Sequence, residues 1–270
     1  MSTNHFFRVS TVNSLNAAPL NYGLKCGLGS SYIRVKFQSP SLCADSLKRG
    51  DADIGLISSI EYARIPNIEI ISRHCIASFK RVRSVLVLAK TPLSDVRTIA
   101  MDTSSRTSVV LGQILLRERY GVHAKVVDMA PNQVEMLTNC DAALLIGDPA
   151  MRAVQNGLLV IDLAEEWYNW TGLPFVFAVW AIRKDVIEQT MYWDIATLLN
   201  DSLKIGERNL NAIIDEVQPS IGWLKCELKE YLTKNICYSL GGPELSGLDL
   251  FYKKALQHGF ITELKPIVFF

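Results

Sequence analysis

The order of predicted strands and helices repeats along the chain, and this repeat constrains the fold more than any other feature. The predicted elements are, in order, strand 6–12, strand 31–38, helix 39–50, strand 52–58, strand 84–90, strand 98–101, helix 106–119, strand 124–129, helix 131–139, strand 141–147 and strand 174–182. Several strands are short apolar runs of the kind found at the centre of a parallel sheet. Strand–helix–strand order is typical of α/β folds.

We interpret the two halves as two α/β lobes with a ligand cleft between them. Lobe 1 is predicted to comprise residues 1–90 and 180–270, and lobe 2 is predicted to comprise residues 91–179. Pro92 marks a connector between the lobes, and the buried strand at 174–182 is expected to bring the chain back. From Asp185 onward the pattern is helical, so this part of the chain should cover lobe 1.

Composition excludes several classes of protein. With 270 residues, 49% of them hydrophobic, 20% charged and a net charge of +1, the chain is globular and gives no reason to expect a nucleic-acid partner. The longest apolar run, Leu173 to Ile182, is too short for a membrane span. No export signal is recognisable and the six cysteines form no C-x-x-C pair, which predicts a cytoplasmic protein with reduced thiols. A homodimer is compatible with the sequence.

Polar residues follow several of the predicted strands. In parallel α/β sheets, ligands bind beyond the carboxyl ends of the strands, where helix N-termini point. The segments that meet this condition are Asn13–Asn16, Ser58–Ser59, Thr103–Ser108 and Gly147–Asp148. We expect them to line the cleft.

The segment Asp102–Ser108 is rich in hydroxyl groups and directly precedes a long amphipathic helix. One or two of these hydroxyls can cap the helix through bonds to its free amides. The remaining hydroxyls, the amides and the helix dipole would together suit an anion. Capping alone and an anion site are both compatible with the sequence at this point.

Motifs for metal or nucleotide chemistry are not found. The four histidines, His5, His74, His123 and His258, are far apart in sequence and show no ligand spacing. There is no phosphate-binding loop of the Walker type and no G-x-S-x-G elbow. We therefore predict no metal and no cofactor.

The chain resembles the chorismate dehydratase family of the futalosine route to menaquinone. The resemblance lies in six segments, VNSLNAAPLNYGL, SPSLCADSLKRGDADIGLISSIEYA, DTSSRTSVVLGQILL, LLIGDPA, EWYNWTGLPFVFAVWA and LSGLDLFYKKA, which span nearly the whole chain. It implies the fold of type II periplasmic solute-binding proteins and a cytoplasmic hydro-lyase. The family removes water from chorismate to give 3-[(1-carboxyvinyl)oxy]benzoate, with a carboxylate of the substrate itself thought to act as the base.

The resemblance also assigns roles to residues. Asn16 matches the family's active-site asparagine, which would hold the reactive pose, although an Asx-turn before Pro19 would account for it equally well. Thr107 and Ser108 are expected to be the main donors to a substrate carboxylate. Arg106 would pair with a carboxylate or point to solvent. The full set expected to bind substrate is Ser58, Ser59, Ser104, Ser105, Arg106, Thr107, Ser108, Asp148, Thr171 and Gly172.

Alternatives remain at this stage. Dihydroxynaphthoate synthase, a sister family, would carry a histidine beside an acidic residue where this chain has Ile146-Gly147-Asp148. A non-catalytic solute-binding protein would share the fold and the anion cleft, but it would carry an export signal. For Asp148 itself, capping a helix that starts at Pro149 is the preferred interpretation over contact with substrate.

Overall fold

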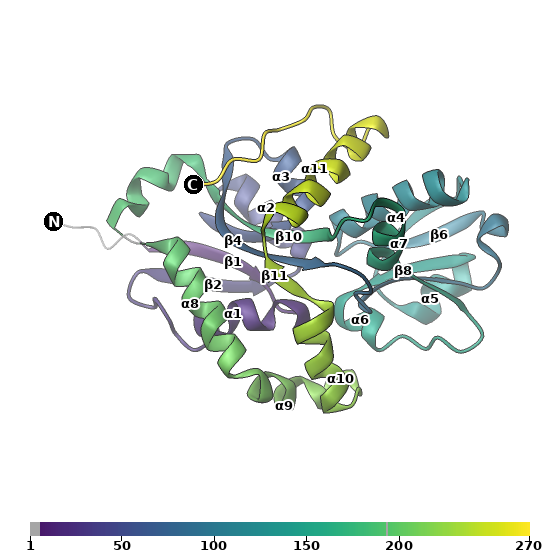
Figure 1. Ribbon diagram of the computed structural model, residues 1–270, viewed down its shortest axis with the longest axis horizontal. Coiled ribbons are helices and arrows are strands. Elements are labelled where there is room, and N and C mark those ends of the chain that lie inside the picture. The colour runs from purple at the N-terminus through teal and green to yellow at the C-terminus, as the bar shows by residue number, and fades with distance from the viewer. Residues whose placement is uncertain (1–5, 193) are drawn as a thin grey trace.

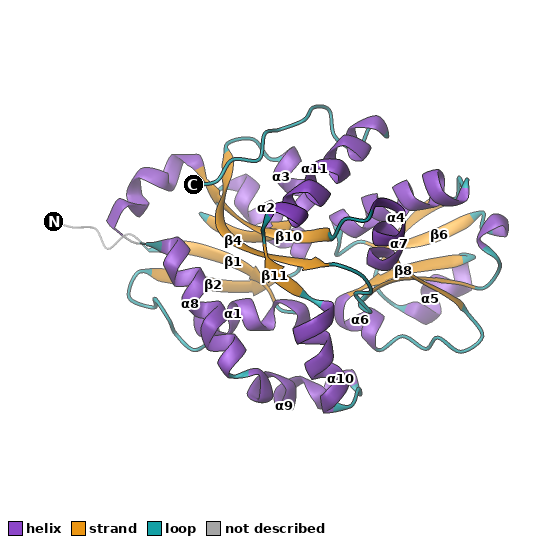
Figure 2. Cartoon of the chain, viewed as in Figure 1, coloured by secondary structure: helices purple, strands orange, loops and turns teal. Residues whose placement is uncertain are grey.

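The computed structural model describes residues 6–192 and 194–270, and it contains two separate β-sheets (Figures 1 and 2). The first sheet has the strand order β11-β4-β10-β3-β1-β2 and the second has the order β7-β6-β8-β5-β9. The strands of the first sheet are β1 (Phe7–Val12), β2 (Ile33–Gln38), β3 (Ile54–Ser58), β4 (Ile68–Ser78), β10 (Phe175–Arg183) and β11 (Cys237–Ser239). Those of the second are β5 (Val85–Ala89), β6 (Thr98–Asp102), β7 (Lys125–Met129), β8 (Ala142–Ile146) and β9 (Leu159–Asp162).

The two sheets share one pattern of pairing. In the first, β1 lies between β2 and β3 and is parallel to both, and β10 pairs antiparallel with β3 and β4. In the second, β6 lies between β7 and β8 and is parallel to both, and β5 pairs antiparallel with β8 and β9. The predicted two-lobed α/β architecture is therefore confirmed. Each lobe presents the carboxyl ends of three parallel strands at one edge of its sheet.

Helices cover both sheets. They are α1 (Ala18–Lys25), α2 (Pro40–Arg49), α3 (Ser59–Arg64), α4 (Arg106–Tyr120), α5 (Gln133–Asn139), α6 (Gly147–Met151), α7 (Leu163–Thr171), α8 (Ile195–Arg208), α9 (Leu210–Ile221), α10 (Lys225–Glu230) and α11 (Gly242–Gln257). Helical segments of other types are η1 (Leu15–Ala17), η2 (Leu93–Asp95), η3 (Lys184–Tyr192) and η4 (Tyr231–Asn235). As Figure 1 shows, α8 to α10 run along one side of the first lobe and α11 extends across toward α4 of the second.

The predicted helix ends are confirmed where a local signal marks them. Ser39 caps α2 by accepting a hydrogen bond from the Leu42 amide, and Gly50 ends the helix in the left-handed conformation, with φ of 79°. At the packing of α1 against α8, a Cβ at Gly206 would lie 2.1 Å from the carbonyl oxygen of Pro19, so only glycine fits there. The C-terminal helices are thereby held tightly against lobe 1.

The expected lobe boundaries require correction. The chain changes sheets between β4 and β5, at residues 79–84, and returns between α7 and β10, at residues 172–174. The boundaries expected near 90 and 180 instead place β5 in lobe 1 and most of β10 in lobe 2. Both strands are apolar and largely buried on both faces, so their sequences suit the centre of either sheet.

Candidate functional site

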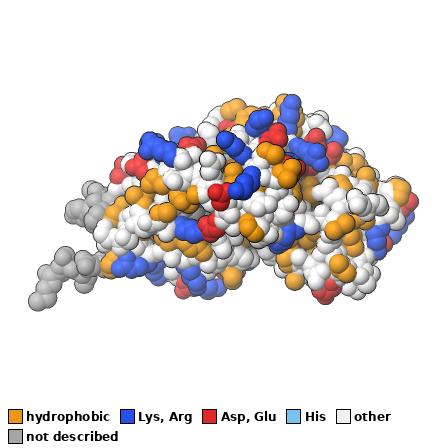
Figure 3. Space-filling model, turned by 90° about the horizontal axis from the view of Figure 1, so that it is seen from below, with side chains coloured by type: hydrophobic (Ala, Val, Ile, Leu, Met, Phe, Trp, Pro, Cys, Tyr) orange, Lys and Arg blue, Asp and Glu red, His pale blue; other side chains and the backbone are white. Residues whose placement is uncertain are grey.

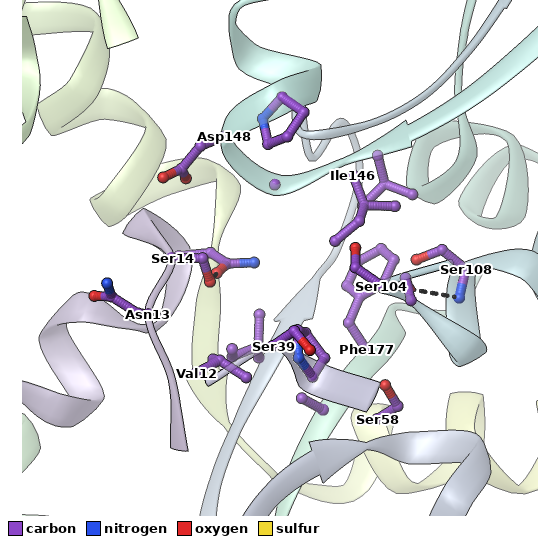
Figure 4. A pocket seen from close by; sticks show the side chains of 18 of the residues that line it. Val12, Asn13, Ser14, Ser39, Ser58, Ser104, Ser108, Ile146, Asp148 and Phe177 are labelled. Carbon is purple, nitrogen blue, oxygen red and sulfur yellow. Dashed lines mark hydrogen bonds between the residues drawn. The ribbon is translucent and has the colours of Figure 1, made fainter. Parts of the chain in front are cut away.

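A cavity of about 390 Å³ lies where the carboxyl ends of the parallel strands of both lobes meet (Figure 4). This volume falls within the roughly 300–1,000 Å³ that is usual for small-molecule sites. Lobe 1 contributes Val12, Asn13, Ser14, Asn16, Gln38, Ser39, Pro40, Leu56, Ser58, Ile76, Phe177 and Ala178, and lobe 2 contributes Val85, Ser104, Ser105, Ser108, Ile146, Gly147, Asp148, Pro149 and Arg152. The cleft predicted between the lobes is therefore present.

Three serines at the start of α4 face the cavity from lobe 2. Ser105 caps the helix, because its Oγ accepts a hydrogen bond of 3.2 Å from the amide of Ser108. Ser108 is almost fully buried, and within the described residues its own hydroxyl has no hydrogen-bond partner. Ser104 Oγ lies 2.6 Å from Oδ1 of Asp102. Hydroxyls at a helix N-terminus, where the dipole is positive, suit an anionic group of a ligand.

Asn16 faces these serines from lobe 1. It lies in η1, shortly after β1, and its side-chain Oδ1 accepts a hydrogen bond of 2.6 Å from the hydroxyl of Ser14. That bond fixes the orientation of the amide and leaves Nδ2 without an acceptor among the described residues. The Asx-turn interpretation does not describe this geometry, since the donor to Oδ1 is a side chain and not a backbone amide. Asn16 therefore presents a free N–H donor at the cavity.

Asp148 links the two lobes beside the cavity. Its Oδ1 accepts a hydrogen bond of 3.1 Å from the backbone amide of Leu15, which belongs to the other lobe. Burial raises the pKa of Asp148, although the Leu15 amide and the charge of Arg152 oppose that rise. The preferred interpretation of Asp148 as a helix cap is wrong: α6 already begins at Gly147, and its cap position is held by Ile146.

Apolar side chains form the floor of the cavity between the polar groups. Phe177 lies between the labelled serines of the two lobes in Figure 4, and Leu56 and Ile76 line the same wall. Ser58, at the end of β3, adds a hydroxyl with no hydrogen-bond partner among the described residues. Arg152 lines the outer part of the cavity and is largely exposed. The site thus combines an apolar wall for a ring with donors placed on opposite sides.

Thr107 and Ser59 do not line the cavity, although both were expected to bind substrate. Thr107 Oγ1 accepts a hydrogen bond of 3.1 Å from the amide of Ile60, and Ser59 Oγ lies 3.3 Å from Thr107 Oγ1 while donating to the carbonyl of Val176. The two contacts of Thr107 join α4 to α3, and the bond from Ser59 to Val176 joins α3 to β10 within lobe 1. The expectation for both residues is corrected: their hydroxyls hold the lobes together.

Arg106 also points away from the cavity. Its guanidinium donates to Glu61 Oε2 at 2.9 Å and to the two carboxylate oxygens of Asp45 at 2.8 and 3.0 Å. Both acids belong to lobe 1, so this is a bridge between the lobes. Neither alternative given for Arg106, a substrate carboxylate or solvent, describes its place.

Thr171 and Gly172 form the end of α7 and are not part of the cavity. Thr171 Oγ1 donates to the carbonyl of Trp167 and accepts from the amide of Leu173. Gly172 ends the helix with φ of 69°. These two residues lie where the chain returns to lobe 1. Their assignment to substrate binding is corrected, because neither lines the cavity.

Several lining residues were not singled out by sequence reasoning. Asn13 and Ser14 lie in a segment expected to face the cleft, and the signal that identified the segment was its place after a strand. Ser39 caps α2 and also lies at the cavity. Arg152 and Phe177 carried no local signal, because tertiary packing of the segment just after α6 and of the buried strand β10 places them at the cavity.

Comparison with known proteins now identifies the family. A family model described as menaquinone biosynthesis matches residues 7–257. The chain belongs to this family. Similar proteins include the chorismate dehydratase of Thermus thermophilus, 28% identical over 87% of this chain and 90% of the relative, and that of Campylobacter jejuni, 31% identical over 62% of this chain and 63% of the relative.

Solved structures similar to this family member share its fold. A structural-genomics protein of Archaeoglobus fulgidus superposes with a TM-score of 0.79 at 18% identity, covering 96% of this chain and all of that one. The periplasmic aliphatic sulphonate binding protein of Escherichia coli gives a TM-score of 0.67 at 12% identity, covering 96% of this chain and 89% of that one. The expected periplasmic-binding-protein-like fold is confirmed.

Three further observations concern membrane-spanning helices, surface charge and metal ligands in this family member. No helix within residues 6–192 and 194–270 is long and apolar enough to cross a membrane. Figure 3 shows basic and acidic side chains interspersed over the face it presents, without a field of one sign. In the same described part of the chain, no three His, Cys, Asp or Glu side chains are grouped so that they could hold a metal ion.

Proposed function

We propose that this protein is a chorismate dehydratase, a hydro-lyase that converts chorismate to 3-[(1-carboxyvinyl)oxy]benzoate and water on the futalosine route to menaquinone. The observation that carries the proposal is that the free Asn16 amide and the serine hydroxyls at the start of α4 line the same cavity from different lobes. Membership of the menaquinone biosynthesis family and the two similar chorismate dehydratases support it.

The reaction removes a proton from the ring carbon that carries the enolpyruvyl ether and expels the hydroxyl from the neighbouring carbon. The electron pair of the broken C–H bond forms the new double bond that makes the ring aromatic, and the proton and hydroxide together are the water released. The ring carbon that loses the proton is saturated and vinylogous to the ring carboxylate, so a carbanion formed there is conjugated with that carboxylate through a ring double bond. Negative charge therefore spreads into that carboxylate as the proton leaves.

Ser105 and Ser108 would stabilise this developing charge. A carboxylate placed at the N-terminus of α4 would accept hydrogen bonds from the two hydroxyls and would feel the positive end of a helix 15 residues long. Donors aimed at the charge that develops in a transition state act as an oxyanion hole does. The apolar wall around Phe177 keeps the surroundings of the ring dry, which strengthens these interactions.

Asn16 would hold the reacting part of the substrate. A neutral amide cannot act as the base, but Nδ2 can donate to the leaving hydroxyl or to a carboxylate, and Ser14 keeps it in one orientation. The side-chain carboxylate of chorismate would then take the proton. No histidine lines the cavity among the described residues, and the end of β8 is followed by Gly147 and Asp148, which weighs against the sister synthase.

The test is incubation of the purified protein with chorismate, followed by chromatography for the enolpyruvyl-benzoate. We expect chorismate to be consumed at an unchanged rate when a chelator is added. If chorismate binds but is not consumed, the protein is a solute-binding protein. If it is ignored while a cyclic futalosine derivative is consumed, the protein is the sister synthase.

A further inference from the structure

Asp102 is a buried acid beside the cavity that the chemistry above does not use. It is the last residue of β6 and its exposed fraction is 0%. Oδ1 accepts hydrogen bonds from the amide of Ser104 at 2.8 Å and from its hydroxyl at 2.6 Å. Oδ2 accepts none from the described residues. Both contacts with Ser104 therefore fall on one oxygen of a buried carboxyl group.

The contact with Asp102 determines what Ser104 can do. A serine hydroxyl has one proton to donate and two lone pairs with which to accept. Because Asp102 Oδ1 already accepts the Ser104 amide, this oxygen is an acceptor, and the Ser104 hydroxyl must be its second donor. Burial raises the pKa of Asp102, and the contacts with Ser104 and the nearby amide of Ile146 oppose the rise. A neutral acid protonated on Oδ2 leaves Oδ1 an acceptor, so Ser104 behaves in the same way in either state.

The neighbouring serines, Ser105 and Ser108, can donate a hydrogen bond to a ligand, whereas Ser104 cannot. Ser105 Oγ accepts from the Ser108 amide, which leaves its proton free. Ser108 Oγ has no partner among the described residues, so its proton is also free. Of the three hydroxyls that this loop presents to the cavity, Ser104 therefore offers only lone pairs, and the other two can donate.

We propose that Asp102 is a positioning residue that fixes Ser104 as the hydrogen-bond acceptor for the hydroxyl of the substrate, while Ser105 and Ser108 bind a carboxylate. The proposal rests on the proposed function. Chorismate carries two carboxylates, which only accept hydrogen bonds, and one hydroxyl, which can donate. Lone pairs on Ser104 repel a carboxylate and attract the hydroxyl, so the loop favours one orientation of the bound substrate. The aromatic product has lost the hydroxyl and loses this contact.

The product therefore serves as a natural probe that lacks the recognised group. In the Ser104→Ala variant, kcat/KM for chorismate should fall about three- to tenfold, the value of one neutral hydrogen bond, while the affinity for product should stay as in the wild type. Asp102→Ala should have the same effect, and the double variant should lose no more than either single one, because the two residues act as a unit. Asp102→Asn should recover most of the loss, since an amide oxygen can accept from Ser104 as Oδ1 does.

Thr103→Ala is the matched control, because Thr103 is exposed in the same loop and does not line the cavity. Melting temperatures show which variants are folded, and Ser104→Ala carries the test if Asp102→Ala does not fold. Equal losses for chorismate and product, additive losses in the double variant, or no loss in Ser104→Ala would each overturn the inference. A wild-type protein that leaves chorismate unchanged would instead refute the proposed function.

Discussion

Replacing Asn16 by alanine tests the centre of the proposed site. The substitution removes the free Nδ2 donor and leaves the backbone of η1 in place. A hydrogen bond to a charged or charge-developing group contributes about 1.5–3 kcal/mol, which corresponds to a roughly 10- to 150-fold decrease in kcat. Substrate should still bind, because the serines at α4 lie on the opposite wall. We therefore expect a large effect on kcat and a small one on the dissociation constant of chorismate.

Two further variants at this position distinguish orientation from charge. Asn16→Asp keeps the acceptor for Ser14 but turns the free donor into a carboxylate beside a dianionic substrate, so it should be at least as damaging as alanine. Ser14→Ala keeps the Asn16 amide and removes the bond that orients it, so it should cause a smaller loss, about three- to tenfold. The order of kcat should be wild type, then Ser14→Ala, then the two Asn16 variants.

The assay is steady-state consumption of chorismate, measured by chromatography, together with direct binding of chorismate by calorimetry. Thermal unfolding of each variant provides the control for folding. A normal kcat in Asn16→Ala would show that Asn16 only shapes the turn after β1, and the assignment of the catalytic group would then fail. If Asn16→Ala raises the dissociation constant of chorismate and leaves kcat unchanged, Asn16 binds the substrate but does not orient the reacting atoms.

Three other substitutions separate binding, pH dependence and stability. Ser108→Ala removes a donor to the carboxylate into which negative charge spreads in the transition state, so steady-state kinetics should show kcat/KM lowered about tenfold or more, with kcat lowered as well as KM raised. An unchanged kcat would limit Ser108 to ground-state binding. Because burial raises the pKa of Asp148, the folded state binds more protons than the unfolded state at pH values between about 3.9 and the raised pKa, and stability falls as the pH rises through this window. In Asp148→Asn, melting temperatures measured across this window should lack the contribution of Asp148 to the fall with pH. A pH dependence equal to that of the wild type would contradict the assignment. Thr107→Val leaves the buried amide of Ile60 without its acceptor, so the free energy of unfolding should fall by about 1–3 kcal/mol while the affinity for chorismate is kept. A comparable loss of binding free energy for chorismate would show that Thr107 contacts the substrate.

The order of the secondary structure could be predicted because its signals are local. Caps, apolar runs and helical periodicity act over a few residues, and they located α2, α4 and most of the strands. Strand β4 was missed although it is the longest, with 11 residues. Its middle carries Ser72, Arg73 and His74, and its pairing with β10 contains two irregularities of register, so no regular alternation runs along it. Such a strand is held by its neighbours and not by its own pattern.

The lobe boundaries depended on pairing between distant strands. Both β5 and β10 lie next to strands that are far away in sequence. The sequence of an apolar run does not indicate which sheet the strand will join. The placement of residues 79–84 and 172–174 as the two connections is therefore a property of the folded chain. Pro92, which suggested a connector, lies beyond β5 and precedes η2 within the second lobe.

The candidate site was predicted to the level of segments but not of side chains, and the start of α4 shows why. Successive residues of an α-helix point about 100° apart, so Thr107 and Ser108 project in different directions, and Thr107 is turned toward α3. Sequence reasoning treated the run of hydroxyls as one set of donors. In the folded chain each hydroxyl has a separate role, since Ser105 caps the helix, Thr107 joins it to α3, and Ser108 keeps a free hydroxyl.

The direction of each hydroxyl proton is a further property that only the folded structure supplies. A serine is written in the same way whether it donates to a ligand or accepts from one, and its partner on the protein decides between them. At Ser104 that partner is Asp102, two residues earlier, whose carboxyl group is buried because β6 is the central strand of its parallel set. Recognition of a substrate with two carboxylates and one hydroxyl needs donors and an acceptor in a fixed arrangement. One buried acid at the end of a strand is sufficient to create that difference among three otherwise identical side chains.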